Sequence, residues 1–395
     1  MSSSDVFIVS AARTPIGSFN GTISKLKASD LGSVVIKEVL KRANCSPDDV
    51  NEVIMGQALT ANQGQNPARQ ASLQAGLSID VPAFGLNLLC GSGLKSVCLG
   101  YQAIKAGDSS VHVCGGQESM SQAPHVIHLR DGIKMGSGEI RDTMLKDGLT
   151  DAMKQIHMGV TAENLSKMYD ITREQQDLYS VKSQNLAEQA QKNGWFDNEI
   201  VPVEVVSRKG TTIFDKDEYI KHGATVEQLA KLKPCFITDG SGSVTAGNAS
   251  GINDSAAAVL LMSGEEVQKR GLKPLAKIVA WSQTGCNPEV MGIGPVKAVN
   301  EVLKKANWTK EEVDLYELNE AFAAQSLSVL KALELDDSKV NVNGGAIALG
   351  HPIGASGARI LVTLLYLMQR TNGKKGVASL CIGGGMGIAI AVEQV

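Results

Sequence analysis

Two segments that lie far apart in this chain are near copies of each other. Residues 38–50 read EVLKRANCSPDDV and residues 301–313 read EVLKKANWTKEEV, with seven of thirteen positions identical. In the same register, the segment that starts CGSGLKS at Cys90 pairs with the segment that starts GASGARI at Gly354. Self-similarity of this kind is the signature of a duplicated structural unit. The chain is therefore predicted to contain two copies of one fold.

Short apolar runs alternate with helical patterns along the chain. Runs at residues 6–9, 111–114 and 377–382 have the length and composition of buried strands, and the last two are followed by glycines. Residues 31–40 carry apolar side chains at helical spacing with Asp30 as a candidate N-cap, and residues 360–368 show a second such pattern. Alternating strands and helices predict an α/β fold in layers.

The chain has 395 residues, which is more than a single hydrophobic core usually holds. The repeat divides it into three parts. We expect a first half at 1–118 with 249–270, an inserted loop domain at 119–248, and a second half at 271–395. The insert has no counterpart in either copy, is polar, and contains a helical stretch at 173–192. It is expected to cap one end of the pair and bind substrate, although a purely structural insertion remains an alternative.

Charge and cysteine usage exclude several classes of function. The net charge is −3 with dispersed signs, which leaves no basic face for nucleic acid and no polybasic segment for a membrane. The seven cysteines are scattered and contain no CxxC pair, so neither a disulfide framework nor a metal site is expected. The N-terminus resembles no targeting segment, which predicts a cytoplasmic protein with small-molecule partners.

Cys90 follows the apolar run GLNLL and precedes a glycine-rich turn. In the repeat register it lies where a strand ends and a helix starts near Ser92. The positive end of a helix favours a thiolate, so Cys90 is a candidate nucleophile. A buried, unreactive cysteine is the alternative.

Three further residues could complete a reactive site. His351 lies in the second copy, three residues before Gly354, and could act as the base for Cys90 if the two copies face each other. Cys381 ends an apolar run, and the glycines after it offer N–H groups to an oxyanion. Asn319 could position a water or an oxyanion. The alternatives are a structural role for His351 and a helix N-cap role for Asn319.

Four separated motifs, in this order, resemble those of the thiolase family: CGSG at Cys90, NEAFA at Asn319, GHPIGASG at His351 and CIGGGMG at Cys381. The segment GNASG at 247–251 adds a fifth landmark, and the likeness runs over essentially the whole chain. It implies two duplicated α/β halves in a layered αβαβα arrangement with an inserted loop domain.

The resemblance also implies a two-step reaction. Cys90, deprotonated by His351, would take an acyl group from acyl-CoA, and Cys381 would remove the α-proton of a bound acetyl-CoA, whose carbanion attacks the acyl-cysteine. One oxyanion site would use Asn319 and His351, and the other the N–H groups of Cys90 and Gly383. Coenzyme A thioesters would be the substrates, and no further cofactor is expected.

Residues of the insert and of the second half resemble those that set chain length and hold CoA. His157 and Met158, with Leu149 and Phe322, would narrow the acyl pocket to that of the short-chain, acetoacetyl-CoA-forming members. Ala246 and Ser250 would contact the pantetheine arm. Lys221 stands where many relatives carry arginine, which removes the planar fork of that side chain.

Three other functions are open to a chain of this type. A broad-range 3-ketoacyl-CoA thiolase would differ mainly in the acyl pocket. A β-ketoacyl synthase would carry a second histidine where this chain has Cys381. A non-catalytic lipid-binding relative would be expected to lack some of the four motif residues. The family implies a homo-oligomer, a dimer of dimers.

Overall fold

The computed structural model describes residues 5–208 and 210–395. Within them, ten strands form one sheet in the order β12-β13-β14-β11-β1-β10-β5-β3-β4, with β2 paired to β10. The strands are β1 (Val6–Arg13), β2 (Gly17–Ser18), β3 (Glu52–Gly56), β4 (Ala83–Leu86), β5 (Val111–Ser119), β10 (Asn253–Ser263), β11 (Ala276–Gly285), β12 (Leu315–Leu318), β13 (Lys375–Ile382) and β14 (Met386–Glu393). Strands β1 and β11 pair over a short stretch only, so the sheet divides there into two halves.

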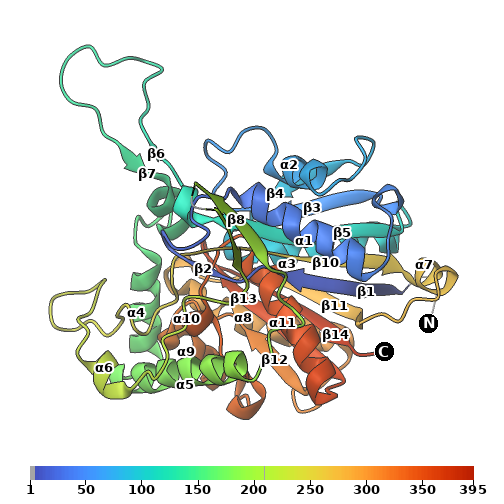
Figure 1. Ribbon diagram of the computed structural model, residues 1–395. Helices are drawn as coiled ribbons and strands as arrows, with labels where there is room; N and C mark the ends of the chain where they lie inside the picture. Colours follow the sequence, from blue (N-terminus) through green and yellow to red (C-terminus); the bar gives the residue numbers. More distant parts are fainter. Residues whose placement is uncertain (1–4, 209) are drawn as a thin grey trace.

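Helices form three layers around these two halves (Figure 1). Helices α1 (Ala28–Arg42) and α2 (Pro67–Gln74) cover the outer face of the first half. Helices α8 (Gly294–Ala306) and α9 (Ala323–Leu333) cover the outer face of the second. Between the halves lie α3 (Ser92–Ala106) and α11 (Ser356–Thr371), whose apolar side chains share one core with strands of both. The expected αβαβα layering is confirmed, and the repeated segments of α1 and α8 occupy matching outer positions.

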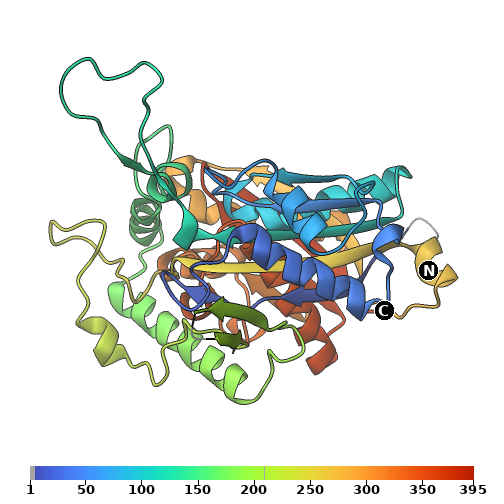
Figure 2. The ribbon, with the colours of Figure 1, turned by 45° about the horizontal axis from the view of Figure 1, so that its top comes forward.

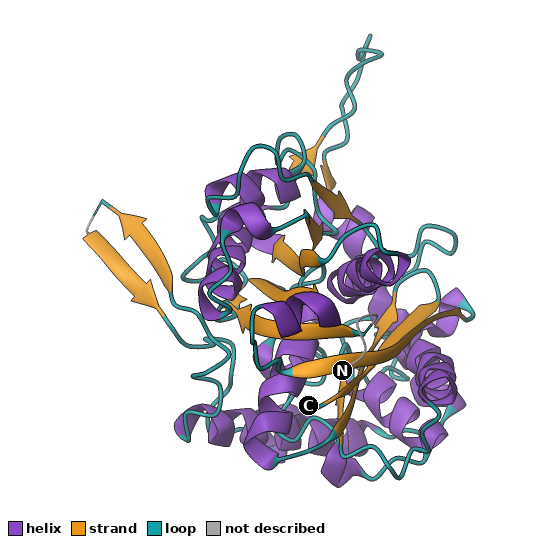
Figure 3. Ribbon diagram, turned by 90° about the vertical axis from the view of Figure 1, so that its right-hand side faces the viewer, coloured by secondary structure: helices purple, strands orange, loops and turns teal. Residues whose placement is uncertain are grey.

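The insert gathers at one end of the two halves (Figures 1 and 2). Its elements are β6 (His125–Val126), β7 (Arg141–Asp142), α4 (Met158–Met168), α5 (Arg173–Lys192), β8 (Val203–Ser207), β9 (Gly210–Phe214) and α6 (Val226–Ala230). The β6–β7 and β8–β9 hairpins project away from the body (Figure 3). Two short helices, α7 (Gly264–Lys269) and α10 (Ala346–Leu349), complete the described chain. In that part of the chain, every helix is too short or too polar to cross a bilayer.

The N-terminal ends of α3 and α11 approach each other closely because each carries a glycine at the contact. A Cβ on Gly93 would lie 2.8 Å from the backbone nitrogen of Ala358, and a Cβ on Gly357 would lie 2.4 Å from that of Leu94. Contacts that short are forbidden to a side chain, so only glycine fits at either position. This approach brings the turn before α3 and the turn before α11 together.

Two local expectations were wrong. The first helix starts at Ala28, so Asp30 occupies its first turn, where its carboxylate accepts from the backbone N–H of Lys27 at 2.9 Å, and Asp30 is not the N-cap. The strand expected to end at Cys90 ends earlier, because β4 stops at Leu86 and is a partly exposed edge strand. Periodicity alone does not distinguish a short edge strand and its following turn from a buried strand.

Candidate active site

A cavity of about 450 Å³ opens between the insert and the ends of the two halves. Its wall is mainly apolar, which suits the acyl and pantetheine parts of a thioester better than a charged group. Nine of the residues expected from the sequence line it: Cys90, Leu149, His157, Met158, Ala246, Ser250, Phe322, His351 and Gly383. Asn319, Lys221 and Cys381 do not reach the wall itself.

Cys90 lies in the single helical turn Leu89–Gly91 that directly precedes α3. The preceding residue, Leu89, has φ of +47°, a left-handed conformation that an L-residue adopts only at a cost of about 1–2 kcal/mol. Neighbouring side chains hold this turn. Asn87 Oδ1 accepts from Leu89 N at 2.8 Å, and Ser92 Oγ accepts from Leu88 N at 2.8 Å. The conformation of this turn directs the Cys90 side chain into the cavity.

The two copies of the repeat meet at Cys90 and His351. His351 Nε2 lies 3.3 Å from Cys90 Sγ, while Nδ1 lies 2.5 Å from Ser356 Oγ. The Ser356 hydroxyl donates its only proton to Pro352 O at 2.9 Å, so towards the ring it can only accept. Nδ1 therefore carries the imidazole proton and Nε2 presents a lone pair to the thiol. That tautomer is the one a general base requires.

Burial keeps both partners neutral before substrate binds. It raises the pKa of the Cys90 thiol to about 11, against a smaller lowering by the backbone N–H of Gly383. It lowers the pKa of His351 to about 3, with a further lowering from the charge of Arg359. The backbone N–H groups of Cys90 and Gly383 lower the pKa of the thiol, in the direction expected of the end of α3, but desolvation outweighs them.

Asn319 lies next to His351, and Cys381 lies close to Cys90. The amide nitrogen of Asn319 lies 3.5 Å from both ring nitrogens of His351, and its oxygen has no partner among the described residues. Asn319 is not a helix N-cap, since α9 begins at Ala323 with Phe322 in that position. Cys381 is fully buried. Burial is the main cause that raises its pKa well above the ordinary range, and the neighbouring Cys90 adds to the effect.

Glu118 connects the His351 turn to the first half. Its buried carboxylate accepts from Gly354 N at 2.8 Å and from Ala58 N at 2.9 Å, and burial raises its pKa to about 7. On the other side of the turn, Asn253 Oδ1 accepts from His351 N at 3.0 Å. These two contacts fix the backbone on either side of the imidazole.

Aromatic and sulfur-containing side chains close the acyl end of the cavity. The ring of His157 stacks on Phe236 with centroids 4.6 Å apart, and Phe236 meets Phe322 edge to face at 6.2 Å. A Cβ on Gly383 would lie 3.5 Å from Met158 Sδ, so this methionine lies over the glycine turn beside Cys90. Burial lowers the pKa of His157, which favours a neutral ring in this wall.

Lys221 stands at the edge of the cavity. Its ammonium lies 4.9 Å from the ring centre of Tyr219, and Tyr219 lines the wall together with Ala246 and Ser250. A cation held over an aromatic ring can attract an anionic group while keeping its stem in place. Lys221 itself is exposed to solvent.

Several lining or supporting residues escaped the sequence reasoning. Ser356 carries a signal in retrospect, since it is the serine of the repeated GASG and CGSG turns. Phe236, Tyr219, Met120, Met291 and Cys235 line the cavity without any motif of their own. Cys235 is exposed and contributes to the wall. Across residues 5–208 and 210–395 no cluster of three or more His, Cys, Asp or Glu side chains could hold a metal.

Comparison with known families gives two adjoining matches. The family description "Thiolase, N-terminal domain" matches residues 6–265, and "Thiolase, C-terminal domain" matches residues 272–394.

Full-length relatives and solved structures agree with these matches. The chain is 57% identical over 392 residues to the cytosolic acetyl-CoA acetyltransferase of Rattus norvegicus, with 99% of each chain covered. It is 59% identical to an acetyl-CoA acetyltransferase of Chromobacterium violaceum, covering 99% of this chain and all of the relative. The crystal structure of the Bacillus anthracis acetyl-CoA acetyltransferase superposes with a TM-score of 0.97 at 45% identity, and that of human mitochondrial 3-ketoacyl-CoA thiolase with 0.95 at 44%, each covering 99% of both chains.

Proposed function

The chain belongs to the thiolase family, and from this premise we propose that it is an enzyme that condenses two molecules of acetyl-CoA to acetoacetyl-CoA and free CoA, reversibly. The relatives from rat and Chromobacterium, which match over the full chain at 57% and 59% identity, are named acetyl-CoA acetyltransferases. The observation that carries the proposal is the 3.3 Å contact between Cys90 Sγ and His351 Nε2 at a mainly apolar cavity.

In the first half-reaction, the Cys90 sulfur attacks the carbonyl carbon of acetyl-CoA. His351 Nε2 takes the thiol proton as the C–S bond forms, and the tautomer held by Ser356 leaves that nitrogen free to accept it. When the tetrahedral intermediate collapses, the CoA sulfur departs with the proton returned by the imidazolium. Acetyl-Cys90 and free CoA remain. Because the resting pair is neutral, proton transfer accompanies attack.

Backbone N–H groups would hold the developing oxyanion of this step. The N–H of Gly383 interacts with the Cys90 sulfur in the free enzyme, and that of Cys90 stands at the start of α3. Donors fixed before the reaction need no reorganisation during it, and each is worth about 3–4 kcal/mol in the transition state.

In the second half-reaction, Cys381 removes the α-proton of a second acetyl-CoA. The resulting enolate carbon attacks the acetyl group on Cys90, and the C–S bond to Cys90 breaks. The proton taken by the Cys381 thiolate then passes to the departing Cys90 sulfur, which leaves acetoacetyl-CoA, the Cys90 thiol and the Cys381 thiolate. Burial makes the Cys381 thiolate a strong base once it forms, and a strong base is what a weakly acidic carbon requires. The Asn319 amide and the His351 ring would face the enolate oxygen, either directly or through a water.

The wall of the cavity supports a preference for short acyl groups. Met158 and Phe322 pack together at one end, and Leu149 lies against the same region as Cys90. A longer 3-ketoacyl chain would have to displace them. The likeness to a 3-ketoacyl-CoA thiolase structure keeps a broader chain-length range as the second candidate. Comparing turnover of acetoacetyl-CoA with that of a long-chain 3-ketoacyl-CoA separates the two.

The remainder of each CoA molecule would extend towards the insert. Ala246 and Ser250 line the cavity for the pantetheine arm, and Lys221, beside Tyr219, could meet a phosphate. We also propose a cytosolic location, because the rat and mouse relatives are named cytosolic enzymes.

A homo-oligomer, a dimer of dimers, belongs to the same proposal. Exposed apolar side chains on the β6–β7 hairpin support it, among them Met135, which is 93% exposed, and Ile140, which is 67% exposed. Apolar groups that protrude in this way are typical of protein interfaces. Sedimentation equilibrium gives the mass directly, and a monomer at micromolar concentration would contradict this part of the proposal.

The decisive experiment is intact-protein mass spectrometry after mixing with acetyl-CoA, followed by peptide mapping. We expect one acetyl group on Cys90, lost when free CoA is added. Folded protein that acquires no acetyl group would reject the acyl-enzyme mechanism and favour a non-catalytic acyl-binding protein.

A further inference from the structure

The buried face of α5 is polar along most of its length. A helix packed on a protein body usually buries an apolar stripe. Here the side chains of Gln176, Asp177, Ser180, Ser183 and Gln184 are each at most 5% exposed. Buried polar groups are costly unless they are hydrogen-bonded. What these groups bond to therefore indicates what the helix does.

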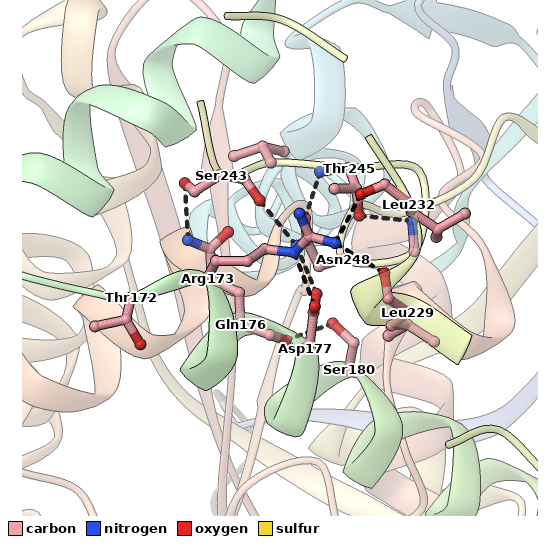
Figure 4. A network of polar contacts seen from close by, with 12 residues as sticks. Thr172, Arg173, Gln176, Asp177, Ser180, Leu229, Leu232, Ser243, Thr245 and Asn248 are labelled. Carbon is pink, nitrogen blue, oxygen red and sulfur yellow. Dashed lines mark hydrogen bonds and ion pairs between the residues drawn. The ribbon is translucent and has the colours of Figure 1, made fainter. Parts of the chain in front are cut away.

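The first two turns of α5 hold the loop that lines the pantetheine side of the cavity (Figure 4). Asp177 Oδ2 accepts from Arg173 Nε at 2.8 Å, and Oδ1 accepts from Asn248 Nδ2 at 3.0 Å. Asn248 in turn accepts from Thr245 N at 2.7 Å. The carboxylate thus fixes the loop from Thr245 to Ser250 through one fully buried amide.

Three more hydrogen bonds from the same turns reach neighbouring segments. Gln176 Nε2 donates to Ser243 Oγ at 3.0 Å. Arg173 Nη2 donates to the carbonyls of Leu229 and Leu232 at 2.8 and 2.9 Å, just before Cys235 and Phe236 of the wall. The partners of this end belong to the segments 229–232 and 243–248, which adjoin or contribute to the cavity wall.

The middle of α5 holds a different set of residues, through Glu320. Ser183 Oγ donates to Glu320 Oε2 at 2.7 Å, and Tyr179 Oη donates to Oε1 at 3.1 Å. Glu320 directly follows Asn319 and also accepts from Ile347 N at 3.1 Å, in the short helix α10 before His351. The hydroxyl of Ser183 further accepts from Gly345 N at 3.0 Å. This end of the network supports the residues that face the reacting atoms.

We propose that α5 is a positioning helix with a division of roles along its length, in which its two parts position different groups. Its first two turns set the affinity for the CoA moiety, and its middle sets the geometry of acyl transfer. The inference rests on the proposed function for the identity of the ligand. Asp177 and Ser183 are accordingly positioning residues, which act through Asn248 and Glu320 and touch no substrate.

The first test is Asp177→Asn, which preserves size but turns an amide towards the Arg173 guanidinium. Loosening of the loop should raise KM for acetyl-CoA and the Kd of CoA about tenfold, as expected for the loss of one charged hydrogen bond. The kcat should stay within about twofold, because the reacting groups are untouched. Acetyl-N-acetylcysteamine, which lacks the nucleotide and most of the pantetheine arm, should react at the unaltered rate.

The second test is Ser183→Ala, which leaves Glu320 short of a donor and Gly345 N unpaired. Acetyl transfer should slow about tenfold with either thioester, since small displacements of catalytic groups cost this much or more. KM for acetyl-CoA and the Kd of CoA, measured by calorimetry, should remain within about twofold. The matched control is Lys182→Gln. Lys182 lies on α5 and forms a surface ion pair with Asp337, which lies outside the helix, so its loss should change neither the rate of acetyl transfer nor the binding of CoA.

The kinetic and binding effects of the two variants, taken together, test the proposal. Equal losses with acetyl-CoA and acetyl-N-acetylcysteamine in the Asp177 variant, or weakened CoA binding in the Ser183 variant, would overturn the division. If Asp177→Asn does not fold, Gln176→Met removes the bond to Ser243 Oγ and should give the same rise in KM. An unaltered enzyme that binds CoA but never acetylates Cys90 would reject the proposed function, while the binding measurements would still test the role of α5.

Discussion

Ser356 Oγ lies 2.5 Å from His351 Nδ1, the ring nitrogen that does not face Cys90. Because the serine proton goes to Pro352 O, this contact determines which nitrogen of the imidazole is the base. The serine belongs to the turn that the repeat pairs with the turn after Cys90, so the duplication would supply the proposed nucleophile in one copy and its oriented base in the other.

Ser356→Ala should therefore slow acetylation of Cys90. Without the acceptor at Nδ1, the ring can move its proton to Nε2 and turn a donor towards the thiol. We expect a fall of about 10–100-fold in the burst rate with acetyl-CoA, at or below the lower end of what general-base catalysis contributes. Rapid-quench mass spectrometry measures the burst. Ser356→Thr, which keeps the hydroxyl, should recover most of it, and a burst of normal size and rate in the alanine variant would show that the contact is dispensable.

The neutral resting pair predicts the pH dependence of Cys90 alkylation. With a pKa of about 11, the Cys90 thiol is mostly protonated below pH 11. With a pKa of about 3, the His351 imidazole is mostly neutral above pH 3. The rate of modification by iodoacetamide should then rise steadily from about pH 6 to about pH 10, as the thiolate fraction grows. Peptide mapping reports Cys90 separately from the other thiols. A rate that is constant over neutral pH would reveal a preformed thiolate–imidazolium pair instead.

Cys381→Ala should separate the two half-reactions. Acetylation of Cys90 should persist, because the nucleophile, its base and the Gly383 turn remain. Exchange of the α-protons of acetyl-CoA with deuterium oxide should be lost, since Cys381 is the base that the proposed mechanism assigns to this step. Proton NMR of recovered acetyl-CoA measures the exchange. Cys286→Ala is the matched control because Cys286 is a nearby, half-buried thiol, and it should exchange normally. Exchange at the parent rate in the Cys381 variant would remove that residue from the base role.

Met158→Ala should broaden the acyl range. Met158 is 7% exposed and packs with Phe322 against the turn at Gly383, so its removal opens space beside the acyl group. The ratio of kcat/KM for 3-ketohexanoyl-CoA to that for acetoacetyl-CoA should rise about tenfold, the scale of one or two methylenes in an apolar pocket. Met168→Ala, at the exposed end of the same helix, serves as the control. An unchanged ratio would place the chain-length limit elsewhere in the wall.

Local patterns predicted the elements that position the site. The 173–192 helix was placed with its observed ends, Arg173 and Lys192, because a Thr172–Gln175 capping box and a continuous polar pattern define it within the chain itself. The repeat likewise predicted that the turns at Cys90 and His351 would converge. The helix depends on residues a few positions apart, and the repeat is found by comparing two segments. Both signals are present in the amino-acid sequence itself.

The sequence by itself determined the duplicated α/β fold and its layers, and it predicted the candidate reactive side chains. Only the tertiary structure decided their chemical state. Whether Cys90 rests as thiol or thiolate depends on how far the folded chain removes it from water, and the helix terminus visible in the sequence is the weaker influence. The tautomer of His351, the stacking of His157 on Phe236 and the partners of Asp177 all join residues that come together only on folding. Such contacts leave no periodicity along the chain, because each is made with residues from another element.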